Sequence, residues 1–290
     1  MPLAQFTVPA GATLGGIAKK FGVPLGVLID ANDIKDPNKI EAGRVLIIPA
    51  STTDAMDHPT VSIPSLDTPM PTGLNVNQKK FRMPVSMFMN EEQRKDLIVL
   101  HYTAGGSARS AFDTWLQAAN RVATAYIVDL DGTIYELFDP KCWAFHLGLT
   151  GTAAAGHKHH RRSIGIEIVN VGVLKPSKTN AEQLNWWPGD FGTKFCLKTE
   201  SEKYIKRSFR GFDFHAAFPE AQIAQTCALV RHLCDRFDIP KQIPKAAKRE
   251  EFDLPFATGF SGVISHQSFR KDKFDVGPAF DWKRVFNGVE

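Results

Sequence analysis

The chain has 290 residues, of which 43% are hydrophobic and 23% charged, and its formal net charge is +4. This length accommodates two folding units, the composition is that of a globular protein, and no apolar run approaches the roughly 18 to 20 residues of a membrane span. The small, dispersed positive charge suits an anionic surface but does not indicate a nucleic-acid-binding protein.

The beginning of the chain predicts a small βααβ unit. Residues 1–6 carry no basic cluster and no long apolar stretch, so we expect no secretory signal. Thr13 is placed to cap a helix, Gly22 to end it and Pro24 to start another. The expected elements are a strand at 6–8, helices at 13–21 and 25–31, and a closing strand at 44–48.

This first unit resembles a LysM module. The residues that carry the resemblance are Phe6-Thr7-Val8, Gly11, Thr13-Leu14, Ile17-Ala18, Phe21-Gly22-Val23, Leu28, Ala31-Asn32 and residues 40–49. The resemblance implies a domain that binds N-acetylglucosamine-containing glycans such as peptidoglycan, through the loops near Gly11, Thr13 and Leu14 and near residues 34–40. A purely structural βααβ cap is the alternative, because the unit has no aromatic platform beyond Phe6.

A connector is predicted after this unit. Residues 51–79 are rich in Pro, Thr, Ser and Asp and poor in apolar side chains, which is the composition of an extended, poorly packed segment. We therefore expect three parts: a glycan-binding domain at 1–50, a linker at 51–79 and a larger domain at 80–290.

The larger domain alternates predicted strands and helices, which predicts an α/β fold with a mixed central sheet and helices on its faces. The apolar run at 97–100 suits a strand buried on both faces, and Asp131-Gly132 suits a hairpin turn. The expected strands are 96–102, 125–130, 133–138, 164–169 and 262–265, and the expected helices are 110–119 and 219–237.

The four cysteines do not indicate a disulfide-stapled fold. Cys227 and Cys234 lie on one face of the helix at 219–237, about 10 Å apart along its axis, which is too far for a disulfide. We interpret both as core residues. The sequence leaves open whether Cys142 and Cys196 pair.

Three potential metal ligands stand at or after the ends of predicted strands. His101 and His266 each end a strand, and Asp275 follows His266 by nine residues. Strand ends meet at the rim of a sheet, and two imidazoles with one carboxylate leave a fourth zinc position open, as in a catalytic site. A lone histidine at a strand end is more often a hydrogen-bonded structural residue, so the spacing alone gives only a modest hypothesis.

Residues 80–285 resemble the zinc-dependent N-acetylmuramoyl-L-alanine amidase family, which includes phage lysozyme-type amidases and peptidoglycan recognition proteins. The resemblance lies in residues 98–105, 126–134, Phe145-His146-Leu147-Gly148, residues 163–167, Ala221-Gln222, Ile239-Pro240 and residues 273–282. It implies that His101, His266 and Asp275 hold one zinc ion and that Glu167 and Lys273 are catalytic. It also implies that His146 and Tyr102 bind substrate in the cleft.

These residue types suit amide hydrolysis. Zinc lowers the pKa of water toward neutrality, Glu167 is placed to transfer a proton, and Lys273 is placed to stabilise a developing oxyanion. The alternatives are a surface salt bridge for Glu167 and a solvated loop position for Lys273. A carboxylate inside the apolar run 164–169 favours the functional interpretation of Glu167.

Other polar clusters give weaker predictions. His157, His159 and His160 with Arg161 and Arg162 are expected to form a solvated loop that at most attracts anionic substrates. The segment 170–214 is long for a connection and contains Trp186-Trp187, so we expect it to wall the cleft or to cover a helix. We interpret His58, His215 and His232 as structural residues.

The combined pattern predicts a hydrolase that cleaves the amide between N-acetylmuramic acid and L-alanine, tethered to bacterial peptidoglycan by the LysM module. We expect it to act on the cell wall, in the periplasm or outside the cell, as a phage endolysin or a lytic effector. Its delivery would be by holin-dependent release or specialised secretion. Rival hypotheses are a non-catalytic peptidoglycan receptor, a recycling amidase for soluble anhydro-muropeptides and a glycan adhesin. The sequence leaves the oligomeric state open.

Overall fold

The computed structural model describes residues 4–21, 28, 32, 34, 40–48, 73–118, 120–150, 157–186 and 193–286. None of the helices in these ranges has both the length and the apolarity that a membrane span requires. The four cysteines are buried and free, so Cys142 and Cys196 do not pair.

The N-terminal unit is built on a two-stranded antiparallel sheet and a helix. Strand β1 (Ala4–Thr7) pairs with β2 (Val45–Ile48), and helix α1 (Leu14–Phe21) begins where Thr13 Oγ1 accepts a hydrogen bond from Gly16 N. These three elements confirm the predicted ones, and the helix expected at 25–31 lies outside the described residues except for Leu28. The core of this unit consists of Val8, Leu14, Ile17, Ala18, Leu28, Ile34, Leu46 and Ile48.

The Asn32 side chain ties this unit together. Its amide nitrogen donates to Leu28 O at 2.8 Å and to Ile47 O at 2.7 Å, and its amide oxygen accepts from Ile47 N at 2.6 Å. One partly buried amide therefore satisfies backbone groups on both sides of the unit, which would otherwise lose hydrogen bonds.

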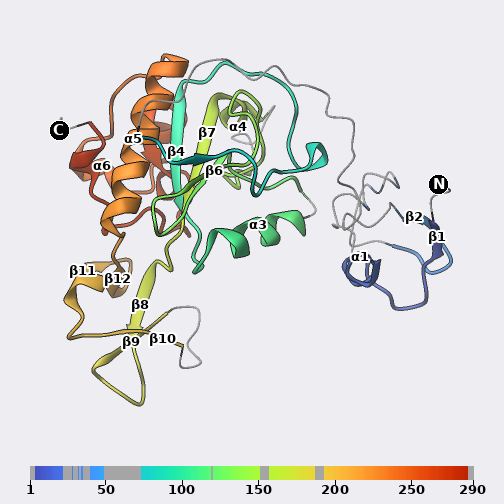
Figure 1. The fold of residues 1–290 in the computed structure, drawn as a ribbon, viewed down its shortest axis with the longest axis horizontal. Coiled ribbons are helices and arrows are strands. Elements are labelled where there is room, and N and C mark those ends of the chain that lie inside the picture. Colours follow the sequence, from blue (N-terminus) through green and yellow to red (C-terminus); the bar gives the residue numbers. More distant parts are fainter. Residues whose placement is uncertain are drawn as a thin grey trace.

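The larger unit has a six-stranded mixed sheet, and Figure 1 shows helix α5 lying along it. All neighbouring pairs are parallel except the β5–β6 hairpin, as predicted from Asp131-Gly132. In spatial order the strands are β13 (Gly262–Ser265), β4 (Leu97–Tyr102), β7 (Ser163–Ile168), β5 (Tyr126–Val128), β6 (Ile134–Glu136) and β3 (Val76–Asn77).

Strand β4 is buried on both faces, as the apolar run predicted. Ile98 and Leu100 belong to the main core, and Leu97 and Val99 belong to a second cluster on the opposite face. Helix α5 (Glu220–Phe237) contributes buried side chains to the main core, among them Cys227 and Cys234. The remaining helices are α3 (Ala108–Leu116), α4 (Lys158–Arg162), α6 (Ala246–Arg249), α7 (Leu254–Gly259) and the 3₁₀ turns η1 (Val85–Met87), η3 (Ser201–Lys203), η4 (His266–Ser268) and η5 (Trp282–Arg284).

Two predicted boundaries differ from the structure. Strand β3 pairs with β6, and Leu74 and Val76 pack on the main core, so the larger unit already includes residues 73–79 that were assigned to the connector. A two-residue edge strand between polar residues carries no detectable periodicity. Helix α3 begins two residues before its predicted start because Ser107 Oγ accepts from Ser110 N and caps it.

The long segment after β7 forms a second sheet, which we call the inserted sheet. Its five strands are all antiparallel, and Figure 1 shows it projecting from the rest of the larger unit. Its core consists of Val171, Leu174, Leu184, Cys196, Phe214 and Ala216. In spatial order the strands are β10 (Lys194–Leu197), β9 (Gln183–Trp186), β8 (Val173–Pro176), β12 (Phe212–Ala216) and β11 (Tyr204–Phe209).

The two ends of the inserted sheet are held together at its base. The Asn170 side-chain amide donates to Ala216 O at 3.3 Å and to Ala217 O at 3.2 Å, and Ala216 N donates to Gly172 O at 2.8 Å. The chain therefore leaves β7 and returns toward α5 at nearly the same place.

Candidate metal centre

Adjacent strands bring the three candidate ligands to one rim of the main sheet. His101 lies near the end of β4, and His266 follows directly after β13, its parallel neighbour. Asp275 lies in the loop after η4, and its backbone oxygen accepts from Gln267 N at 2.8 Å, which holds this loop against the turn that carries His266. All three side chains are buried.

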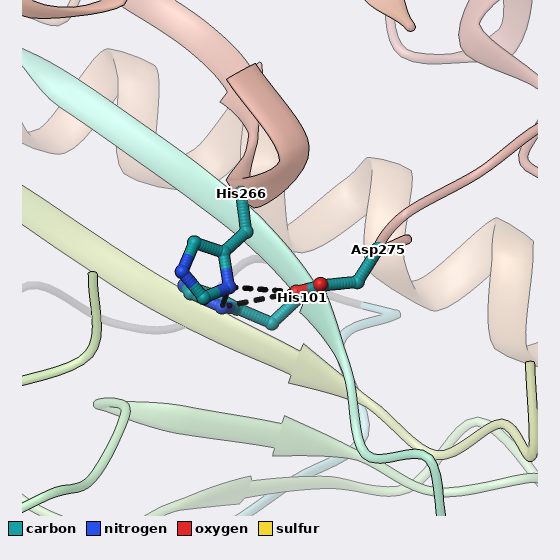
Figure 2. Close-up of side chains that lie close together, drawn as sticks. All are labelled: His101, His266 and Asp275. Atoms are coloured by element: carbon teal, nitrogen blue, oxygen red, sulfur yellow. Dashed lines mark hydrogen bonds and ion pairs between the residues drawn. The ribbon is translucent and has the colours of Figure 1, made fainter. Parts of the chain in front are cut away.

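The ligand atoms of these residues converge on one point (Figure 2). His101 Nδ1 lies 3.0 Å from His266 Nδ1, and Asp275 Oδ2 lies 2.9 Å from His266 Nδ1 and 3.4 Å from His101 Nδ1. A tetrahedral ion with bonds of about 2.0 to 2.1 Å, the length of zinc–imidazole bonds, holds its ligand atoms about 3.3 Å apart. In the part of the chain that the structure describes, this is the one group of three residues able to hold a metal ion.

One hydrogen bond of His266 fixes which of its nitrogens faces the other two ligands. His266 Nε2 lies 3.0 Å from Leu147 O. A carbonyl oxygen only accepts, so Nε2 donates to it, and Nδ1 is the ring nitrogen that faces His101 and Asp275.

A longer chain of hydrogen bonds fixes the proton of His101. Ser163 Oγ donates to His159 O at 2.7 Å and lies 2.8 Å from His146 Nε2, which therefore donates to it. His146 Nδ1 is then an acceptor, and His101 Nε2, 2.9 Å away, donates to it. His101 Nδ1 is left as a lone pair. One potential ligand atom from each of the three residues thus faces the same point, an arrangement that suits a cation.

The protonation states of His101 and Asp275 are those that metal binding requires. Burial, reinforced by His266, lowers the pKa of His101 to about 4, although Asp275 opposes this. Burial alone would raise the pKa of Asp275, but the neighbouring His266 and His101 outweigh it and hold that pKa well below its usual range. At neutral pH, His101 is therefore neutral and Asp275 is a carboxylate.

Glu167 and Lys273 share an open cleft of about 370 Å³ with the three ligands. Glu167 lies in β7, paired with His101 of β4, and is 8% exposed. Burial and the charge of Asp275 raise the pKa of Glu167 to about 8, against the opposing effect of Lys273. Tyr102 and His146 also line the cleft, so all seven residues expected in this domain's site lie around one cavity.

Replacing Glu167 with glutamine is expected to stabilise the metal-free protein, increasingly so as the pH rises. In the unfolded chain Glu167 ionises near 4.5, whereas in the folded protein it resists ionisation up to about 8. The folded wild type is therefore destabilised as the pH rises through this window, by an upper bound of about 5 kcal/mol for a shift of this size. Urea unfolding in chelator at pH 5 and pH 8.5 measures the effect, with the exposed Glu202→Gln as control. An equal effect of E167Q at both pH values would contradict it.

The structure corrects the expectation for the basic cluster at 157–162. His160 is buried and accepts a hydrogen bond from His146 N at 3.2 Å. Arg162 binds Asp96 at 2.6 Å and Phe260 O at 2.8 Å. These two side chains therefore support the fold from within and do not belong to a solvated loop. Their partners lie far from residues 157–162 in the sequence, so the local composition of the cluster could not predict these contacts.

The glycan-binding candidates of the N-terminal unit and the remaining histidines also include both buried and exposed residues. Leu14 is buried in the N-terminal core, whereas the other two glycan candidates, Gly11 and Thr13, are exposed, and Thr13 also caps α1. His215 and His232 are buried, in line with their structural interpretation, and His58 lies outside the described residues.

Sequence reasoning missed two groups that support the site: Ser163 orients His146, and Leu147 O orients His266. Val171 and Val173 line the cleft, in line with the expectation that the segment 170–214 walls it. A polar residue, Ser163, at the start of a buried strand was the one sequence signal that could have indicated such a supporting contact. A backbone oxygen carries no signal in the sequence.

Comparison with known proteins gives two matches along the chain. The profile of the N-acetylmuramoyl-L-alanine amidase family matches residues 91–278, and the profile of the LysM domain matches residues 6–49. The first of these covers more than half of the chain.

Individual relatives match over shorter stretches. The N-acetylmuramoyl-L-alanine amidase XlyB of Bacillus subtilis is 27% identical over 99 residues, which is 32% of this chain and 31% of that protein. XlyA of the same species is 38% identical over 78 residues, 25% of this chain and 26% of that protein. The chain therefore spans about a third or less of the length of these two relatives.

Among solved structures, the E. coli amidase AmiD in complex with anhydro-N-acetylmuramic acid-L-Ala-D-gamma-Glu-L-Lys is similar to this chain with a TM-score of 0.41. The sequence identity is 20%, and the match covers 69% of this chain and 59% of AmiD. On the strength of the profile match at residues 91–278, the chain belongs to the N-acetylmuramoyl-L-alanine amidase family, and it carries a LysM domain ahead of the amidase domain.

Proposed function

We propose that this protein is a zinc-dependent peptidoglycan hydrolase that cleaves the amide bond between N-acetylmuramic acid and the L-alanine of the stem peptide. The observation that carries this proposal is the convergence of three potential ligand atoms, 2.9–3.4 Å apart, in a cleft that also contains Glu167 and Lys273. His101, His266 and Asp275 would hold the ion. When bound, zinc supplies Lewis acidity toward water and the scissile carbonyl.

Glu167 moves the proton in this proposal. Its carboxylate takes a proton from the attacking water and delivers it to the leaving amine of L-alanine. A buried carboxyl with a pKa raised to about 8 in the metal-free protein readily holds a proton between these two steps near neutral pH. Donor groups that face the developing negative charge usually supply the largest stabilisation in acyl transfer. Lys273 lines the cleft and would supply this stabilisation in the proposed reaction.

His146 has a different role from the expected substrate contact. Both of its ring nitrogens are engaged within the protein, one with His101 and the other with Ser163. We therefore assign His146 to positioning His101, since partners of this kind hold a ligand's ring and tautomer in place. Tyr102 lines the cleft and remains the proposed substrate contact.

The LysM domain would bind the glycan strands and raise the local concentration of the amidase domain on an insoluble polymer. Its Gly11 loop is the exposed part of the proposed glycan contact. We propose that the protein acts on the bacterial cell wall, in the periplasm or outside the cell, as a phage endolysin or a lytic effector.

Digestion of purified peptidoglycan tests this function. With zinc, the protein should release new muramic-lactyl carboxyl groups and free L-alanine amines; chelator should stop the release, and added zinc should restore it. New reducing sugar ends without L-alanine amines would point to a glycosidase. Binding to peptidoglycan with neither product, in the presence of zinc, would favour the non-catalytic receptor.

A further inference from the structure

The turn that joins β11 to β12 contains an arginine where the backbone favours another residue. Phe209 and Phe212 pair directly, so Arg210 and Gly211 form a two-residue hairpin turn. Their φ angles are +49° and +83°, both in the left-handed region. Turns of this kind favour Asn-Gly or Asp-Gly, and an arginine there is strained. Because the backbone of this turn disfavours arginine, we looked to the contacts of the Arg210 side chain for the reason that it is there.

The Arg210 side chain reaches the loop that carries Lys273 and Asp275. We call residues 270–276 the ligand loop. Arg210 Nη1 donates to Lys273 O and, at 3.0 Å, to Lys271 O, and Nη2 lies 3.5 Å from Glu250 O. One guanidinium thus binds two carbonyl groups of the ligand loop.

Aromatic contacts join the same two segments. The Phe212 and Phe274 rings meet edge to face with centroids 5.6 Å apart, and Arg210 Cζ lies 6.0 Å from the Phe274 centroid. Phe274 immediately precedes Asp275. Hydrogen bonds from a charged donor are about twice as strong as neutral ones, so these contacts are a substantial tether for a loop without regular structure.

We infer that the inserted sheet is a brace for the reaction site and that Arg210 is its positioning residue. By holding the carbonyls of Lys271 and Lys273, Arg210 fixes the ligand loop so that Asp275 faces the two histidines and Lys273 faces the cleft. The role of this brace in catalysis rests on the proposed amidase activity. The fixing of the ligand loop by Arg210 does not depend on that activity.

The substitution Arg210→Asn removes the side-chain contacts with the ligand loop but keeps a residue that suits the hairpin turn. Asparagine is favoured at this turn position, so the thermal unfolding midpoint of the metal-free protein should be unchanged or higher. Hydrogen exchange of backbone amides in the ligand loop should be about 10-fold or more faster, the factor expected for losing a charge-assisted hydrogen bond. Zinc affinity, measured by chelator competition, should fall about 10-fold, as for other lost supports of metal ligands. Arg210→Lys, which keeps a charged donor, should retain part of the protection of the ligand loop against exchange and part of the zinc affinity.

Arg207→Gln is the matched control. Arg207 lies on β11, close to the turn, and its two Nη atoms bind the Glu250 carboxylate, outside the ligand loop, at 2.6 Å. It should leave exchange in the ligand loop and zinc affinity at wild-type values. The inference is overturned if R210N matches the wild type in both readouts, or if R207Q loosens the loop as much as R210N does. Failure of the wild type to release L-alanine amines would instead refute the proposed function, because the exchange comparison in metal-free protein does not depend on activity.

Discussion

Replacing Glu167 with glutamine is expected to lower kcat for release of L-alanine amines from peptidoglycan by about 10²- to 10⁴-fold, the usual contribution of a general acid–base residue. Glutamine keeps nearly the same shape in β7 but neither accepts the proton from water nor returns it to the leaving amine. The measurement is the initial rate of amine release at saturating peptidoglycan, in excess zinc.

Two controls separate lost proton transfer from a damaged site. E167Q should bind zinc with about wild-type affinity, because Glu167 is not one of the three convergent ligands. Glu202→Gln, a change of the same type at an exposed position in η3, should leave the rate unchanged. A rate for E167Q within a few-fold of the wild type would exclude Glu167 as the proton carrier.

Replacing Asp275 with alanine is expected to lower zinc affinity by more than about 100-fold and to abolish amine release. Loss of a partner that merely supports a ligand costs about 10- to 100-fold in affinity, and Asp275 supplies one of the three ligand atoms itself. Chelator competition measures the affinity, and circular dichroism verifies that the variant is folded.

Asp113→Ala is the matched control for this variant. Asp113 is an exposed partner of Arg109 on α3 and lies outside the cleft lining. It should leave zinc affinity and amine release unchanged. Zinc binding by D275A at wild-type strength would show that the ion is held elsewhere.

Local sequence patterns predicted the main sheet because its strands are apolar and continuous. The strands that contain His101 and Glu167, and the strand that ends just before His266, were expected within one residue of their observed ends. The Asp131-Gly132 turn correctly joined β5 to β6. Strand ends meet at the rim of a sheet, so these patterns gave a modest hypothesis that His101 and His266 meet, and the family resemblance strengthened it.

The inserted sheet was not predicted because its strands lack this signal. Strand β11 is mostly exposed and includes Lys206 and Arg207, and a short edge strand with charged side chains reads as a loop. Its contact with the ligand loop joins Arg210 to Lys273, 63 positions apart, through a backbone oxygen. Pairings of this kind depend on the folded arrangement and leave no trace in local composition.

The joined ends of the inserted sheet have a consequence for how this enzyme family can vary. Because Asn170 binds Ala216 and Ala217 directly, the segment between them closes a loop whose ends are already in contact. Such an insertion changes length at little entropic cost to the strands around it. Because its two ends meet, the inserted sheet could be deleted without separating β7 from α5. A protein without it would nevertheless lose the Arg210 tether, and any replacement segment would have to supply a donor for the Lys273 carbonyl.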